Sequence, residues 1–107
     1  MKAALIILLS GMMLSGGVVA ADAKRGAELA QARCMACHSD MMLKVVKFYP
    51  SLNGQKSAYV FKQLVDIRDG NRIAPIMKPM IAGLSEQDFK DLAAYFESLK
   101  PSRLADK

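Results

Sequence analysis

A C-x-x-C-H segment runs from Cys34 to His38 and narrowly limits the chemistry and the fold of this chain. It contains both cysteines and the only histidine of the 107 residues. This spacing is the attachment signature of a c-type haem. The two thiols add to the haem vinyl groups as thioethers, and helical geometry around the motif brings the imidazole to the same face of the haem. The segment therefore predicts one covalent haem c, bound by Cys34, Cys37 and His38.

Two other kinds of site use similar residues. A Cys34–Cys37 disulfide would be typical of thioredoxin-like redox proteins, but that fold needs a strand before the motif and βαβ units around it. The sequence shows no such strand. A structural zinc site needs four ligands, and the chain has only two cysteines and one histidine. Haem attachment is the interpretation that fits the residues best.

The first 20 residues have the pattern of a secretory signal peptide. Lys2 gives a positive start, Ala3 to Leu9 is apolar, and small residues lead to Ala20. We expect cleavage after Ala20, export to the periplasm and a single domain over residues 21–107. An uncleaved anchor is the alternative, but the apolar run is only marginally long enough to span a bilayer. After cleavage we expect no stable membrane insertion.

The remaining sequence predicts an all-α fold. Helical spacing of small and apolar residues predicts helices over Asp22–Arg33 and Ser57–Arg68, and a third that begins at Ser85 and ends before Pro101. No strand is predicted. We expect three to four short helices, joined by the long segments Ser39–Asn53 and 71–83. Loops of this length are uncommon in a small domain, but they are reasonable if they wrap a large apolar cofactor.

A second protein ligand for the iron has to be a methionine, because the chain has no other histidine. Met35 lies inside the motif, and Met41 and Met42 follow the histidine too closely to reach the opposite side easily. Met77 and Met80 are far enough along the chain. A thioether opposite an imidazole suits an electron carrier and raises its potential. The residues alone leave Met77 and Met80 as candidates, and the other methionines are expected to be packing residues.

The charge distribution argues against nucleic-acid binding. The formal net charge is +5, but the Lys and Arg residues are dispersed and form no basic stripe. Four lysines are candidates for a weak basic ring near the haem edge, which would favour a protein partner. They are Lys44, Lys47, Lys56 and Lys78. The alternative is that these side chains are scattered and simply solvated.

Over nearly all of residues 21–107, the chain resembles the class I cytochrome c family. It is similar to the small bacterial periplasmic members and to one half of the dihaem members. The resemblance rests on the motif, on Gly26 eight residues before the first cysteine, and on the segments Pro50–Gln55, Leu84–Asp88 and Asp91–Phe96. Each segment is weakly specific by itself, but their order is specific. The resemblance implies the cytochrome c fold wrapped around one haem.

The same resemblance suggests roles for individual residues. In these relatives the methionine ligand stands seven residues before the leucine that corresponds to Leu84, which implies Met77 and makes Met80 a second, non-ligand methionine. The carbonyl of Pro50 would accept a hydrogen bond from the His38 ring and fix its orientation. Small residues of the first helix would pack against the last helix, with Gly26 and Ala30 against Leu92 and Tyr95.

The chain departs from the family pattern at two places. Ser39 stands where relatives usually have glycine after the histidine. Asp40–Tyr49 is apolar and basic where relatives are often polar and glycine-rich. Both departures lie close to the predicted haem, so they affect the expected docking surface.

Together these features predict a periplasmic electron carrier rather than an enzyme. We expect redox protein partners, a dehydrogenase as donor and an oxidase or reductase as acceptor, and a monomer or a subunit of a small complex. One alternative is a fixed haem subunit of a periplasmic dehydrogenase. A further alternative is a ligand-binding or peroxidase-like haem protein, for which Arg72 is the only nearby candidate for a catalytic helper.

Overall fold

Six helices make up the regular structure of residues 20–102, the part of the chain that this computed structural model describes. They are α1 (Ala23–Arg33), α2 (Met35–His38), α3 (Asp40–Val45), α4 (Ser57–Asp69), α5 (Met77–Met80) and α6 (Glu86–Ser98). No strand occurs within this range, in agreement with the predicted all-α class. None of these helices is long and apolar enough to cross a membrane. The predicted signal peptide, apart from Ala20, lies outside the described residues.

Helix α1 begins at Ala23 because Asp22 caps it. The Asp22 carboxylate accepts hydrogen bonds from the backbone N–H groups of Lys24 and Arg25, at 3.0 and 3.2 Å. These N–H groups have no partner inside the helix, so a capping side chain stabilises its first turn. The helix continues to Arg33, which confirms the predicted range.

Helix α6 begins directly after Ser85, the predicted start, and a capping box stabilises its first turn. Ser85 Oγ accepts a hydrogen bond from the backbone N–H of Asp88 at 3.1 Å, and the Asp88 carboxylate accepts one from the N–H of Ser85 at 2.9 Å. The helix ends at Ser98, shortly before Pro101. Helix α4 ends at Asp69, and the next residue, Gly70, has a φ of 82° in the left-handed region that favours glycine.

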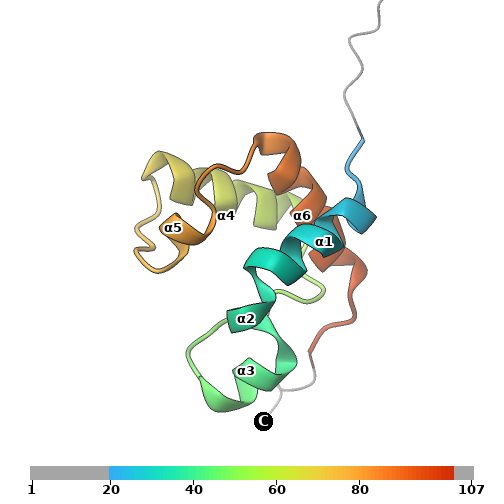
Figure 1. Cartoon of the computed structure of the whole chain (residues 1–107), viewed down its shortest axis with the longest axis vertical. Helices are drawn as coiled ribbons and strands as arrows, with labels where there is room; N and C mark the ends of the chain where they lie inside the picture. Colours follow the sequence, from blue (N-terminus) through green and yellow to red (C-terminus); the bar gives the residue numbers. More distant parts are fainter. Residues whose placement is uncertain (1–19, 103–107) are drawn as a thin grey trace, which may run out of the picture.

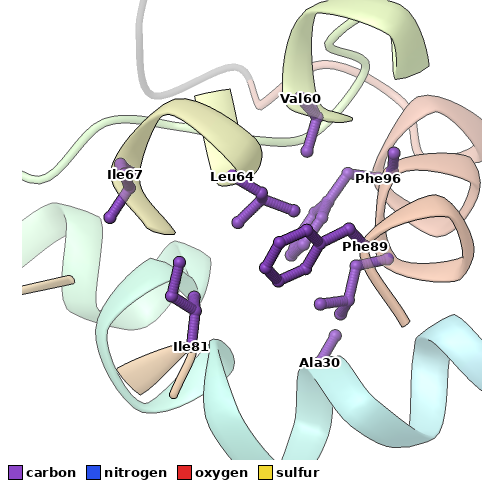
Figure 2. Close-up of a cluster of buried hydrophobic side chains, with 9 residues drawn as sticks. Ala30, Val60, Leu64, Ile67, Ile81, Phe89 and Phe96 are labelled. Carbon is purple, nitrogen blue, oxygen red and sulfur yellow. The ribbon is translucent and has the colours of Figure 1, made fainter. Parts of the chain in front are cut away.

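The core forms where α1 and α4 pack against α6 (Figure 1). Apolar side chains from these helices, together with Ile81 from the loop after α5, converge in one cluster (Figure 2). Its other members are Ala30 of α1, Val60, Leu64 and Ile67 of α4, and Phe89, Leu92, Ala93 and Phe96 of α6. Burial of each large side chain stabilises the fold by about 2 kcal/mol. The close α1–α6 contact at Gly26 and Ala30 agrees with the packing that the family resemblance implied.

A charged clamp ties the start of α1 to α6. Asp91 is only 1% exposed and accepts hydrogen bonds from the backbone N–H of Asp22 at 2.8 Å, from Arg25 at 2.7 Å and from Gln87 at 2.9 Å. Arg25 also pairs with Asp88 at 2.5 Å. Burial by itself raises the pKa of the Asp91 carboxyl, but these hydrogen bonds outweigh it and hold the pKa below its ordinary value.

The clamp predicts a loss of stability in acid. Because the folded-state pKa of Asp91 is depressed, its stabilisation is fully present above the unfolded-state pKa of about 3.9 and is lost as the pH falls through the lower folded-state pKa. Asp91→Asn should lower the free energy of unfolding at pH 7 by about 2 kcal/mol and make this free energy fall less between pH 5 and pH 2. Denaturant titrations of the holoprotein across this range measure both effects. Glu28→Gln, at an exposed position of α1, should change neither, and an unaltered acid dependence in Asp91→Asn would contradict the clamp.

Short helices occur in both segments that we expected to be irregular. Ser39 caps α3, because its Oγ accepts a hydrogen bond from the N–H of Met42 at 3.3 Å. The expectation of irregular chain over Ser39–Asn53 was therefore wrong for Asp40–Val45. Helix α5 is a single turn within the predicted loop of residues 71–83. In the described part of the chain, these short helices and α2 supplement the three longer ones that the sequence predicts.

Candidate functional site

The C-x-x-C-H segment lies at a break between two helices. Cys34 caps the end of α1, with its N–H donating to the carbonyl of Ala30 at 2.8 Å. The following turn is α2, in which the N–H of His38 donates to the carbonyl of Cys34 at 2.9 Å. Cys34 thus lies at the junction of α1 and α2, and Cys37 and His38 lie within the single turn of α2. The two cysteines are half-buried and not joined in a disulfide.

The alternative sites fit this arrangement poorly. A thioredoxin-like motif would follow a strand, and residues 20–102 contain none. Among the same residues, no group of three or more His, Cys, Asp and Glu side chains is arranged to hold a metal ion by itself.

The orientation of His38 is fixed by Pro50. The imidazole is 5% exposed, and its Nδ1 lies 2.9 Å from the carbonyl oxygen of Pro50. A carbonyl can only accept a hydrogen bond, so Nδ1 carries the proton in this contact. The Nε2 lone pair is then available to a metal, and the hydrogen bond holds the ring in place. The structure brings together the two residues that the family resemblance paired.

A largely apolar pocket opens beside the motif. The pocket is open to solvent and has a volume of about 780 Å³. The apolar side chains in its wall come from α4, α6 and the segments between helices: Leu52, Val60, Leu64, Ile67, Ala74, Leu92 and Phe96. Cys34, His38, Pro50 and Met77 line the same pocket. Burial raises the pKa of the Cys34 thiol to about 11, so at neutral pH this is a neutral group at an apolar wall.

Of the two candidate methionines, only Met77 lines this pocket. Met77 is half-buried and packs against the core, whereas Met80 is 38% exposed and lies outside the lining. The loop that carries them is attached to the end of α1. Arg33 donates hydrogen bonds to the carbonyls of Met80 and Ala82, at 3.3 and 3.1 Å. These contacts hold the loop at the pocket.

The pocket also has a polar side, of which the sequence led us to expect only Arg72 near the haem. Gln55, Gln63 and Arg72 line it, and Arg72 donates to Gln63 Oε1 at 2.7 Å. Ser51 lines it too, and its buried Oγ has no hydrogen-bond partner in the structure. Gln63 occupies the same face of α4 as Val60, Leu64 and Ile67. A polar residue within that apolar stripe was the signal that could have identified it.

These features fit a haem group. The apolar wall suits the porphyrin. The Cys34 thiol and the His38 imidazole line the pocket from the attachment motif, and the Met77 thioether lines it from α5. The unpartnered Ser51 hydroxyl and the Arg72–Gln63 pair suit the propionates, which are polar and anionic. Cys37 is half-buried in α2 but is not part of the lining.

Comparisons with known proteins agree with this chemistry. The family model for cytochrome c matches residues 23–100. The chain is 37% identical over 102 residues to cytochrome c4 of Pseudomonas aeruginosa, which covers 95% of this chain and 51% of that protein. It is 40% identical over 68 residues to cytochrome c-554(548) of Halomonas halodenitrificans, covering 61% of this chain and 82% of the relative.

Another relative has a name that describes its role. The thiosulfate dehydrogenase electron acceptor of Stutzerimonas stutzeri is 35% identical over 96 residues, which cover 84% of this chain and 44% of that protein. The chain spans about half the length of this relative and of the cytochrome c4 relatives that it matches.

Proposed function

Because the chain belongs to the cytochrome c family and haem c is therefore its cofactor, we propose that it carries single electrons between redox proteins. The observation that supports this most is that His38 and Met77 line one apolar pocket. Two protein ligands would fill both axial positions of the iron and leave none for a substrate. Such a site can change its charge by one electron with little rearrangement, which suits a carrier better than an enzyme.

Each residue of the site has a distinct role in this proposal. Cys34 and Cys37 would hold the haem through thioether bonds, and His38 and Met77 would be the ligands of its iron. Pro50 positions His38 by accepting the hydrogen bond from its Nδ1. When bound, haem c supplies an iron that alternates between ferric and ferrous states. The apolar side chains around it exclude water and keep the dielectric constant low, which influences the potential.

The proposed location is the periplasm. The apolar segment that follows Lys2 supports a signal peptide of residues 1–20, removed after Ala20, so that residues 21–107 form the mature domain. Thioether attachment of haem takes place outside the cytoplasm, so a signal peptide and a C-x-x-C-H motif in one chain are mutually consistent.

A fixed subunit of a dehydrogenase is the second candidate. The relative named as an electron acceptor of thiosulfate dehydrogenase favours it. In this case the chain would accept electrons inside a stable complex rather than diffuse between partners. Co-purification from the native host would distinguish a complex from a free carrier.

The proposal predicts a reversible one-electron redox reaction. The holoprotein, produced with the haem-attachment machinery, should be low-spin when oxidised and show the weak long-wavelength band of a methionine–iron bond. A potentiometric titration followed by absorbance should give a single step of one electron. The reduced protein should bind carbon monoxide weakly, because no axial position is open. A high-spin oxidised spectrum and tight carbon monoxide binding would instead indicate the ligand-binding or peroxidase-like alternative.

A further inference from the structure

An apolar and basic surface lies next to the haem-attachment motif. We call it the Phe48 surface and define it as Met41, Lys44, Val45, Lys47 and Phe48. The apolar side chains of Met41, Val45 and Phe48 are 76%, 73% and 79% exposed. Both lysines are also exposed. Scattered apolar residues are normal on a surface, but several within one short segment indicate a site of interaction.

The rest of the described fold does not need these side chains. Helix α3 has no buried residue, and its main helical contact is with α2. Figure 1 shows α2 and α3 at one end of the molecule, away from the packing of α4 against α6. Exposure of this segment therefore costs solvation free energy without adding to the core, which suggests that a partner covers it.

The Phe48 surface is connected to the proposed iron ligand by aromatic contacts. The ring of Phe48 packs edge-on against Tyr49, with centroids 5.1 Å apart and an interplanar angle of 74°. The Tyr49 ring centroid is 6.3 Å from that of His38. The next residue, Pro50, accepts the hydrogen bond from His38. A protein seated on Phe48 would therefore lie close to the His38 side of the pocket.

The charges favour an acidic partner over a second copy of this chain. Lys44 and Lys47 are exposed, and Asp40 is the only acidic residue between Ser39 and Pro50. In a symmetric dimer across this surface, the lysines of one copy would face those of the other, which is unfavourable. An acidic surface with an apolar centre would complement it and would also speed association.

We propose that the Phe48 surface is the docking site for an acidic one-electron redox protein. This inference rests on the proposed function and adds the place and the chemistry of the contact. Phe48 and Val45 would provide the apolar centre, and Lys44 and Lys47 the charged rim. Electron-transfer interfaces are small, so a patch of this size is sufficient for a transient complex.

The test uses an acidic probe protein and a readout that is independent of electron transfer. The ¹⁵N-labelled ferrous holoprotein is titrated with oxidised flavodoxin, an acidic FMN protein, at low ionic strength. Amide chemical shifts give both the site and the Kd. The shifts should be largest over residues 40–49. Phe48→Ser should weaken binding roughly thirtyfold, and the double variant Lys44→Ser/Lys47→Ser about tenfold, with loss of most of the salt dependence.

Matched controls separate this surface from other exposed groups. Ile73→Ser removes an exposed apolar side chain from the loop before Met77, and Lys24→Ser removes an exposed lysine from α1. Neither should change the Kd by more than about twofold, as expected for positions outside the interface. The reduction potential and absorption spectrum of every variant should match those of the wild type, so the proposed function is checked separately.

Three results would overturn the docking proposal while leaving the electron-carrier function intact. The first is a shift map centred on residues 71–80 instead of 40–49. The second is no detectable flavodoxin binding at low salt, together with binding to vesicles that contain anionic phospholipid, which would identify the surface as a membrane contact. The third is a Phe48→Ser variant that binds as well as the wild type. An irreversible or high-spin redox site, by contrast, would refute the proposed function itself.

Discussion

Replacement of Met77 by alanine is expected to open one axial position of the iron and to lower the reduction potential. Axial ligands influence the potentials of haem proteins over a range of ~0.8 V, so a fall on the order of 100 mV or more is expected when the thioether is lost. A thioether stabilises the ferrous state, which is why its removal shifts the potential downward. The oxidised protein should become high-spin and lose its weak long-wavelength band.

Met80→Ala is the matched control for this experiment. Both methionines lie in α5, but only Met77 lines the pocket, and Met80 is partly exposed. Met80→Ala should keep the spectrum and potential of the wild type. Haem content should be unchanged in both variants, because the thioether bonds come from the cysteines. If Met80→Ala lost the band while Met77→Ala retained it, the ligand assignment would pass to Met80.

The difference between these methionines shows what the sequence could and could not predict. Spacing from His38 was sufficient to exclude Met41 and Met42, but it left both methionines of α5, and only the family resemblance favoured Met77. Selection between them depends on how a single helical turn is oriented toward the pocket. That orientation comes from contacts such as those of Arg33 with the carbonyls of Met80 and Ala82, which no local pattern encodes.

The longer helices were predictable because their signals are local. Asp22 and Ser85 are capping residues at the correct distance from apolar stripes, and α1 and α6 begin directly after them. The contact between His38 and Pro50 joins residues on either side of α3, and only the family resemblance suggested it. Local sequence patterns thus predicted the longer helices, whereas the contacts within the site depend on the tertiary structure.

In the segment from Ser39 to Tyr49, apolar composition did not predict burial. Its apolar residues would normally be expected in a core, yet Met41, Val45 and Phe48 are among the most exposed apolar side chains of residues 20–102. Composition indicates that such residues seek an apolar contact. It does not indicate whether that contact is inside the chain or on another protein.

Gly26→Ala is expected to destabilise the fold by roughly 3 kcal/mol, although alanine is the better helix former by about 1 kcal/mol. Gly26 is buried in α1 where this helix crosses α6. A Cβ atom at this position would lie 1.9 Å from the backbone carbonyl oxygen of Asp91 and 3.0 Å from the Cβ of Tyr95. Backbone atoms cannot rotate away as a flexible side chain can, so the two helices would have to separate.

Separation of α1 from α6 would also affect the haem pocket. Leu92 and Phe96 of α6 line the pocket, and Cys34 at the end of α1 does as well. We therefore expect Gly26→Ala to reduce the yield of holoprotein in addition to its free energy of unfolding. Guanidinium denaturation of the purified holoprotein, followed by far-UV circular dichroism, measures the second effect.

Glu28→Ala provides the control for helix propensity in this comparison. Glu28 is on the exposed side of the same helix, and its replacement should change the free energy of unfolding by less than about 0.5 kcal/mol. The sign of the change in the free energy of unfolding of Gly26→Ala shows whether helix propensity or the steric contact with α6 contributes more. Destabilisation means that the close approach of α1 to α6 dominates, whereas a variant as stable as the wild type would show that the helices can move apart at little cost and that Gly26 is not required for their packing.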